Sequence, residues 1–314
     1  MKSILIIIDY FGKWPEWLPV FLASCEANPT VNWLIHTDCP IPEKHPTNVS
    51  FSSISLSDHY SRISRILGIN FNPSNPYKLC DIKAFYGALY TNEIKGYDYY
   101  GHGDIDVVYG NIRKFYTDEV LKHDVVSAHD FLVSGHLALF KNTRNTRNAF
   151  RLLPKWKEKL ENQNYMSLDE FESTSLFKRP KIFSEEIRVK WTIILVFCDL
   201  LLDITRPRHA LYWRNNYFIE QYSTPFIYKK WHDGTMDHPD TWYWYNGRIT
   251  NNKDGDREFL YLHFMNFKYP RYMHPIFGKE APWQKLPKLL NFNPKDIGAG
   301  RVRIDRQGFH LEPK

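Results

Sequence analysis

Two aspartates separated by a single residue end an apolar, tyrosine-rich segment of the chain. Asp104 and Asp106 precede Val107 and Val108, which predicts a buried strand ending in two carboxylates and a second strand after it. Carboxylates at i and i+2 lie on one side of an extended backbone and repel each other unless a cation or protons intervene. This is the chemistry of a divalent cation with oxygen ligands, such as Mg²⁺ or Mn²⁺, which also holds a substrate phosphate. The alternative is a pair of turn aspartates at a solvated strand end, and the triplet alone does not decide between them.

The segments before this pair alternate between strand and helix patterns. Three apolar runs are expected to be strands: 3–8, 31–36 and 48–54. Helices are expected over 14–25, with Pro15 in the first turn, over a segment that Ser57 caps and Gly68 ends, and over 79–89. This order predicts an α/β fold with a mainly parallel central sheet flanked by helices.

The second half of the chain carries weaker signals. Asn246-Gly247 between β-prone runs predicts a hairpin over 242–250. Further expected elements are strands over 123–128, 131–140 and 259–267, helices over 155–162 and from a capping Ser167, and a short docking helix in the Pro-rich tail. Residues 185–203 fit either a helix or two strands, and the period does not choose between them.

Composition and charge narrow the class of protein. The net charge of +6 and the 16% aromatic content suit anionic partners, such as nucleotide diphosphates or the anionic face of a membrane. Basic residues between Lys141 and Lys159 fit a solvated helix face or a membrane or acceptor patch. Four scattered cysteines, without a C-x-x-C pair, fit a reducing cytoplasm and argue against zinc and disulfides. The apolar run 191–202 contains Asp199 and is too short to span a bilayer. We therefore expect a soluble or peripheral intracellular protein, with no nucleic acid partner.

Three short stretches resemble elements of the GT-A glycosyltransferases. The run 104–112 is similar to the D-x-D segment of bacterial capsule and O-antigen polysaccharide glycosyltransferases, and SGHLALFKN (134–142) lies where those proteins have an acceptor-side strand. FLYLHFMNFK (259–268) resembles the late H-F-x-x-x-K element of related galactosyltransferases. The resemblance implies that His263 is the third protein ligand of the metal and that Lys268 contacts the diphosphate. Ser134-Gly135-His136 replaces the Asn-Ala-Gly element of the family, which leaves the acceptor and the stereochemistry open.

The resemblance also implies an architecture and an activity. A GT-A-like domain would span 1–270, with a nucleotide-binding half over 1–115 and an acceptor-side half over 116–270, followed by an aromatic-rich C-terminal extension over 271–314. The implied reaction moves a sugar, galactose or galactofuranose, from a UDP-sugar donor to an oligosaccharide or lipid-linked saccharide acceptor in surface polysaccharide synthesis. An imidazole ligand favours Mn²⁺ over Mg²⁺. The implied location is the cytoplasm, with peripheral contact at the inner face of the plasma membrane left open.

Other residues are expected to complete such a site. Asp106 is expected to coordinate the metal directly, whereas Asp104 faces the ribose and shares the metal through water. Further expected nucleotide contacts, each with an ordinary structural role as the alternative, are Asp9, Tyr10, Lys78 and Asp81.

An inverting mechanism would also need a general base. Asp169 or Glu170 is expected in that role, with Glu185 and Glu186 second, although acids at a helix start usually compensate the helix dipole. Retention would require neither pair. Two rival interpretations stay open: a metal-dependent nucleotidyltransferase or phosphodiesterase, and a non-catalytic carbohydrate-binding protein of the same fold.

Overall fold

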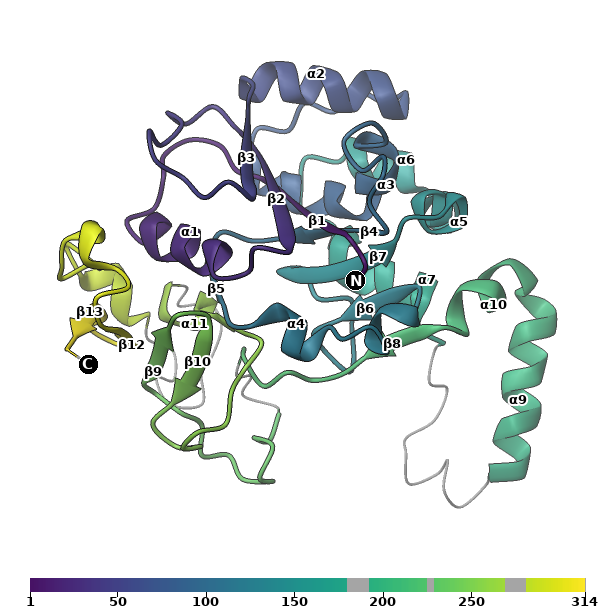
Figure 1. Ribbon diagram of the computed structural model, residues 1–314. Helices are drawn as coiled ribbons and strands as arrows, with labels where there is room; N and C mark the ends of the chain where they lie inside the picture. Colours follow the sequence, from purple (N-terminus) through teal and green to yellow (C-terminus); the bar gives the residue numbers. More distant parts are fainter. Residues whose placement is uncertain (180–191, 225–228, 269–280, 314) are drawn as a thin grey trace.

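The computed structural model describes residues 1–179, 192–224, 229–268 and 281–313 (Figure 1). Glu185 and Glu186, the second expected pair of bases, lie outside these residues. No helix among the described residues is long and apolar enough to cross a membrane.

A seven-stranded sheet forms the centre of the molecule, in the order β3-β2-β1-β4-β7-β6-β8. Its strands are β1 (Ile4–Asp9), β2 (Val31–Thr37), β3 (Val49–Ser53), β4 (Tyr99–Gly103), β6 (Val125–Ser127), β7 (Leu137–Lys141) and β8 (Asn216–Phe218). The first four strands are parallel to one another, β7 is antiparallel to β4 and β6, and β8 is parallel to β6. The predicted α/β class with a mainly parallel sheet is therefore confirmed.

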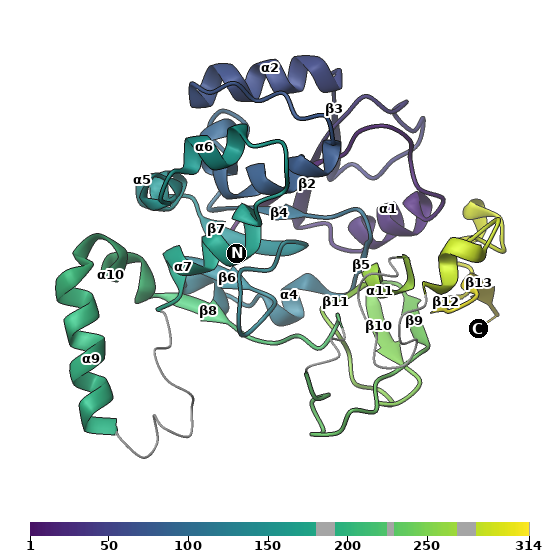
Figure 2. The same ribbon diagram turned by 180° about the vertical axis from the view of Figure 1, so that it is seen from behind.

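Helices cover both faces of this sheet (Figures 1 and 2). The first are α1 (Leu18–Glu26), α2 (Leu56–Leu67), the 3₁₀ segment η1 (Pro76–Phe85), α3 (Tyr86–Leu89), α4 (Ile112–Phe115) and η2 (Val120–Lys122). After β7 follow α5 (Arg144–Asn148), η3 (Ala149–Leu152), α6 (Trp156–Glu161), the π-helical turn η4 (Leu168–Glu172) and α7 (Ser173–Phe177). Apolar side chains of β1 alternate between two buried clusters: Leu5 and Ile7 pack with α2, η1 and α3, whereas Ile4, Ile6 and Ile8 pack with α1.

Two helix starts differ from the prediction. α1 begins at Leu18, so Pro19 and not Pro15 lies in its first turn. The indole of Trp14 stacks on Tyr10, and that of Trp17 donates to the carbonyl oxygen of Ile105. Both tryptophans thus belong to the loop before the helix, which these contacts hold in place. In α2 the cap is Ser55, not Ser57, because its side chain accepts from the amide of Asp58.

A second sheet of four strands joins the C-terminal tail to the middle of the chain. It contains β9 (Trp242–Tyr245), β10 (Arg248–Asn251), β12 (Arg301–Asp305) and β13 (Gly308–Glu312), in the order β10-β9-β12-β13. The Asn246-Gly247 turn has positive φ at both residues, as the sequence predicts for this hairpin. The described part of the tail holds the 3₁₀ turns η5 (Pro282–Lys285) and η6 (Pro294–Asp296) and a hairpin. The predicted docking helix stays a prediction, because residues 269–280 of the Pro-rich tail lie outside the described residues. β12 pairs with β9 across the expected boundary at residue 270.

Two more segments bear on function. β5 (Val107–Tyr109) pairs antiparallel with β11 (Tyr261–His263), and α11 (Met265–Lys268) follows. The predicted strand over 259–267 is thus three residues long and ends in a helical turn. α9 (Thr192–Thr205) shows that the part of the ambiguous segment from residue 192 on is a helix, whereas residues 185–191 lie outside the described residues. α9 and the next helix, α10 (Pro207–Trp213), extend away from the central sheet in both views (Figures 1 and 2).

Candidate metal centre and acidic pair

The two aspartates of the D-x-D triplet meet a histidine that lies far away in the sequence. Asp104 follows β4 directly, and Asp106 leads into β5. β5 pairs with β11 in a register that sets Val107 opposite His263. One ligand atom from each of Asp104, Asp106 and His263 lies within 4.8 Å of the other two. The sheet pairing therefore brings together the three residues that we expect to hold a metal.

Each aspartate of this triad also faces a lysine. Lys83 Nζ lies 2.5 Å from Asp104 Oδ1, and Lys268 Nζ lies 2.6 Å from Asp106 Oδ2. His263 Nε2 is 3.5 Å from the same Asp106 oxygen. Burial alone would raise the pKa of Asp106, but Lys268 and His263 outweigh it and hold the pKa well below its usual value. Asp106 is therefore ionised at neutral pH, as a metal ligand must be.

The triad suits a divalent cation in both donor chemistry and size. Two carboxylates and an imidazole are ligands for Mn²⁺, and ligands about 2.1 Å from such an ion lie about 3 to 4 Å from one another. The observed spread of up to 4.8 Å needs only small side-chain rotations to reach this range. Nδ1 of His263 is buried and has no hydrogen-bond partner among the described residues.

A second histidine supports His263 from behind. The rings of His136 and His263 stack with centroids 4.0 Å apart, and the Tyr261 hydroxyl lies 2.6 Å from His136 Nε2. Burial and the neighbouring His263 lower the pKa of His136 well below its usual value, so this ring is neutral. His136 thus packs against the candidate ligand without adding positive charge.

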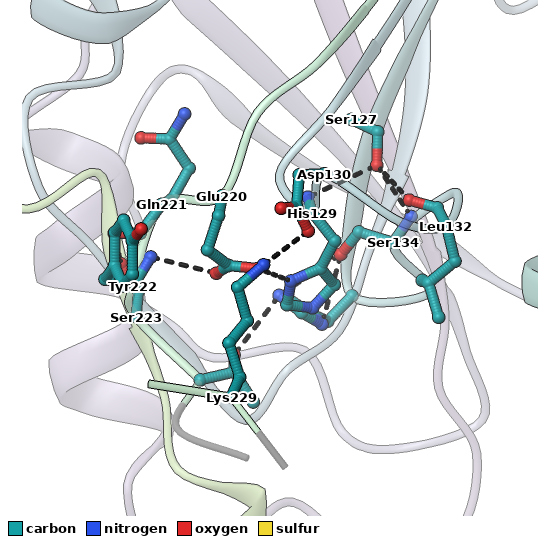
Figure 3. Close-up of polar contacts among 12 residues, drawn as sticks. Ser127, His129, Asp130, Leu132, Ser134, Glu220, Gln221, Tyr222, Ser223 and Lys229 are labelled. Carbon is teal, nitrogen blue, oxygen red and sulfur yellow. Dashed lines mark hydrogen bonds and ion pairs between the residues drawn. The ribbon is translucent and has the colours of Figure 1, made fainter. Parts of the chain in front are cut away.

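The ring of His136 also contacts that of His129, with centroids 5.1 Å apart, and His129 belongs to a network of polar contacts (Figure 3). His129 Nδ1 lies 3.0 Å from Glu220 Oε2, and Lys229 Nζ lies 3.2 Å from the same oxygen. Lys229 also contacts Asp130. These contacts tie the loop before β7 to the chain after β8, so they fix the loop that carries Gly135 and His136.

The acidic pair expected to contain a base lies beside the same loop. Glu170 Oε1 accepts from the amide of Gly135 at 3.3 Å, and the carbonyl oxygen of Gly135 accepts from Lys83 Nζ at 2.8 Å. Asp169 accepts from the Tyr165 hydroxyl at 2.8 Å. Gly135 thus links Glu170 to Lys83, which also pairs with Asp104.

The environment of these acids favours their protonated forms. Burial raises the pKa of Asp169 well above its usual value, and the neighbouring Glu170 adds to the shift, although Lys83 opposes it. Burial also raises the pKa of Glu170 against the opposing effects of Lys83 and His129. The turn that carries them is not capped as predicted, since Ser167 has a φ of 56° and its side chain makes no cap hydrogen bond. These acids therefore do not compensate the dipole of a regular capped helix.

Lys78 and Asp81 have structural contacts in place of the expected nucleotide contact. Asp81 accepts from the amides of Met166 and Leu168, each at 2.8 Å. Lys78 Nζ lies 2.9 Å from Asp81 and donates to the carbonyl oxygen of Asn164 at 2.8 Å. Both side chains have no exposed surface, which also excludes an ordinary surface ion pair. The pair fixes the loop that leads into Asp169.

Asp9 lies at the end of β1 but points into the core. The Tyr90 hydroxyl donates to its carboxylate at 2.7 Å, and His36 and His59 lie 3.0 and 3.5 Å away. Burial would raise the pKa of Asp9, but His59 and His36 lower it well below its usual value. This enclosed carboxylate supports the strand end and does not face a ribose. Tyr10 is half-buried against Trp14, so base stacking there stays a prediction.

These observations define a mixed α/β protein with a candidate metal centre and an acidic pair beyond the carboxyl end of β4, the middle strand of its central sheet. Residues 6–278 match the model of a family of unknown function (DUF6625), and the chain belongs to this family. None of the curated proteins matches the sequence.

Solved structures give weak similarities. Mouse xyloside xylosyltransferase 1 in its apo form is 10% identical, with a TM-score of 0.31 over 72% of this chain and 88% of that one. The glycosyltransferase GlyE of Streptococcus pneumoniae TIGR4 is 11% identical, with a TM-score of 0.31 over 70% of this chain and 55% of that one. The chain thus spans about half the length of GlyE.

Proposed function

We propose that this protein is a metal-dependent glycosyltransferase that uses a nucleoside diphosphate sugar. The observation that carries the proposal is the meeting of Asp104, Asp106 and His263 within 4.8 Å. Lys83 and Lys268 add two cationic groups at the same place. A site of this kind suits an anionic leaving group such as a diphosphate.

Transfer of the sugar breaks the bond between its anomeric carbon and the diphosphate, and negative charge builds on the departing oxygens. A divalent cation held by the triad would offset that charge when bound. Lys268 Nζ lies 2.6 Å from Asp106 and 5.0 Å from the centre of the Trp17 ring. In our proposal this ammonium turns from Asp106 toward a phosphate oxygen of the donor, which retains the expected role of Lys268.

The acceptor side of the proposal rests on Glu170. The pKa of Glu170 is raised toward neutral pH, and a carboxylate with a higher pKa is a stronger base for an acceptor hydroxyl. The Gly135 amide holds Glu170 Oε1 in place, and burial raises the pKa of Asp169 well above its usual value, which favours its protonated form. In this assignment Glu170 removes the proton of the acceptor hydroxyl, and Asp169 positions that hydroxyl. A base in this role corresponds to an inverting reaction.

The finer features of the proposal come from the sequence resemblance. They are UDP as the nucleotide, Mn²⁺ as the cation, galactose or galactofuranose as the sugar, and a saccharide acceptor of surface polysaccharide synthesis. Tyr10 is our candidate for stacking on the base, and Asp104 for the contact nearest the ribose.

Product analysis with a panel of UDP-sugars and saccharide acceptors, with Mn²⁺ or with EDTA, tests the proposal. Asp106→Asn keeps the size of the side chain and removes its charge, so we expect transfer to fall about 10²- to 10³-fold. Asp118→Asn, at an exposed position in a loop, is the matched control and should retain full activity.

Three results would contradict the proposal. Full transfer by the folded Asp106→Asn variant would remove the triad from the reaction. Nucleotide release that does not depend on a saccharide acceptor would favour a phosphodiesterase. Melting temperatures that UDP and Mn²⁺ leave unchanged would favour a binding protein with another ligand, because a ligand at 100 times its Kd stabilises by about 2.7 kcal/mol.

A further inference from the structure

The helical pair α9 and α10 exposes large aliphatic side chains to solvent. The side chains of Leu200 and Leu201 are 53% and 44% exposed, and those of Ile204 and Leu211 are 65% and 68% exposed. Leu200 and Ile204 are four residues apart and share one face of α9. Single exposed leucines are common on protein surfaces, but four large aliphatic residues are exposed here between positions 200 and 211 of two successive helices, and they are called the α9–α10 patch.

Exposed arginines lie on or next to the same two helices and on the neighbouring helix α5. Arg208, Leu211 and Arg214 follow one another at intervals of three residues along one side of α10, and Arg206 precedes that helix. Arg144 lies on α5, which the Tyr212 hydroxyl joins to α10 by donating to the carbonyl oxygen of Asn145 at 3.3 Å.

Ion pairs among the described residues do not cancel this charge. The four exposed arginines are Arg144, Arg206, Arg208 and Arg214, and none forms an ion pair with another described residue. Asp203 on α9 is already paired with Arg179 at 2.7 Å. The patch therefore combines exposed aliphatic groups with unpaired guanidinium groups.

We propose that the α9–α10 patch binds an anionic lipid surface. Leucine and isoleucine side chains enter the boundary between headgroups and acyl chains, while arginines reach the phosphates. A second copy of the chain is a poorer partner, because a symmetric contact through this patch would bring two sets of the same arginines into one interface. This inference is independent of the proposed transfer reaction.

Sedimentation with vesicles tests the inference without any enzymatic readout. The full chain is mixed with vesicles of phosphatidylcholine alone, or with vesicles that also contain phosphatidylglycerol. We expect binding to the anionic vesicles and a marked loss in 0.5 M salt, because the Debye length falls from about 8 Å at physiological ionic strength to a few ångströms.

Two double variants separate the apolar and the charged contributions. Leu200→Glu with Ile204→Glu should weaken binding at least about tenfold, since two inserted side chains become charged. Arg208→Gln with Arg214→Gln should weaken it about 25-fold, from about fivefold for each arginine. Ile66→Glu is the matched control, because Ile66 is a 41% exposed aliphatic residue on the distant helix α2. Circular dichroism checks that each variant is folded.

Several results would overturn the inference. They are no binding of the wild type to anionic vesicles, equal binding to neutral vesicles, and unchanged binding by either folded double variant. A concentration-dependent dimer that the leucine and isoleucine changes dissociate would assign the patch to a second copy instead.

Discussion

Replacing Lys83 by methionine probes the connection between the candidate metal centre and the acidic pair. The Lys83 side chain is 7% exposed, and its ammonium lies 2.5 Å from Asp104 Oδ1 and 2.8 Å from the carbonyl oxygen of Gly135. Methionine has a similar length and can occupy the same space, but it removes the charge and both hydrogen bonds. The change leaves Asp104 without its lysine while Asp169 and Glu170 lose a nearby cation.

The size of the effect follows from burial. Breaking a fully buried ion pair by removing one partner costs about 3 to 5 kcal/mol. The Asp104 side chain is 32% exposed, so water recovers part of this loss. We expect the free energy of unfolding to fall by about 2 to 3 kcal/mol, which lowers the melting temperature by about 4 to 10 °C.

The pH of the measurement follows from the sign of the shift. Burial would lower the pKa of Lys83, but Asp104 and other nearby groups raise it well above its usual value. A raised lysine pKa stabilises the fold fully below the unfolded value of about 10.4, and this contribution is lost as the pH rises through the folded pKa. Melting at pH 7 therefore reports the whole effect.

Manganese distinguishes a metal site from a purely structural ion pair. Lys83 competes with a cation for Asp104, so Mn²⁺ should raise the melting temperature of Lys83→Met more than that of the wild type. Lys122→Met is the control, because Lys122 pairs with Glu119 on the surface and should contribute less than about 1 kcal/mol. A variant as stable as the wild type, or one that gains no more from Mn²⁺, would refute the reasoning.

Two further predictions concern the acidic pair. If Glu170 is the base, transfer by the wild type should rise with pH through a pKa above 4.5, because the carboxyl must be ionised. Glu170→Gln should lose both the transfer activity and this rising part of the pH profile. A variant that keeps the same rise would assign it to another group. In Gly135→Ala the new Cβ would lie 2.8 Å from Glu170 Oε1, so we expect transfer to fall by about 10²-fold while stability falls by about 1 to 3 kcal/mol. Transfer assays and thermal melts check this, and unchanged transfer would contradict the position assigned to Glu170.

The parts of the fold that follow from local patterns were predictable. The run from Ser3 to Ile8 is apolar at nearly every position, since β1 packs against a helix layer on each face. Asn246-Gly247 predicted its hairpin because few residue pairs tolerate positive φ at both positions. The pairing of β5 with β11 was not a local property. It places His263 beside Asp106, and only the resemblance suggested that the two would meet.

Lys83 shows why the rest of the site was missed. It lies 21 residues from Asp104 and 52 residues from Gly135, so no short motif connects them. The segment that carries it is a 3₁₀ helix, Pro76–Phe85, with about three residues per turn. Lys78 and Asp81, three apart, therefore point in one direction, toward the loop before Asp169. Lys83, two residues later, points in another.

The two lysines give the aspartates of the triad different neighbourhoods. The same carboxylate oxygen of Asp106 faces both Lys268 and His263, and the side chain is only 12% exposed. The charge of Asp106 therefore interacts mainly with groups of the metal centre. Asp104 is more open, and its partner Lys83 also lowers the pKa of Asp169 and Glu170. A cation that takes Asp104 would weaken the hold of that carboxylate on Lys83, and the ammonium would then interact more strongly with the acidic pair. Glu170 would ionise more readily as a result. Loading of the donor side would in this way prepare the base on the acceptor side, through a single lysine.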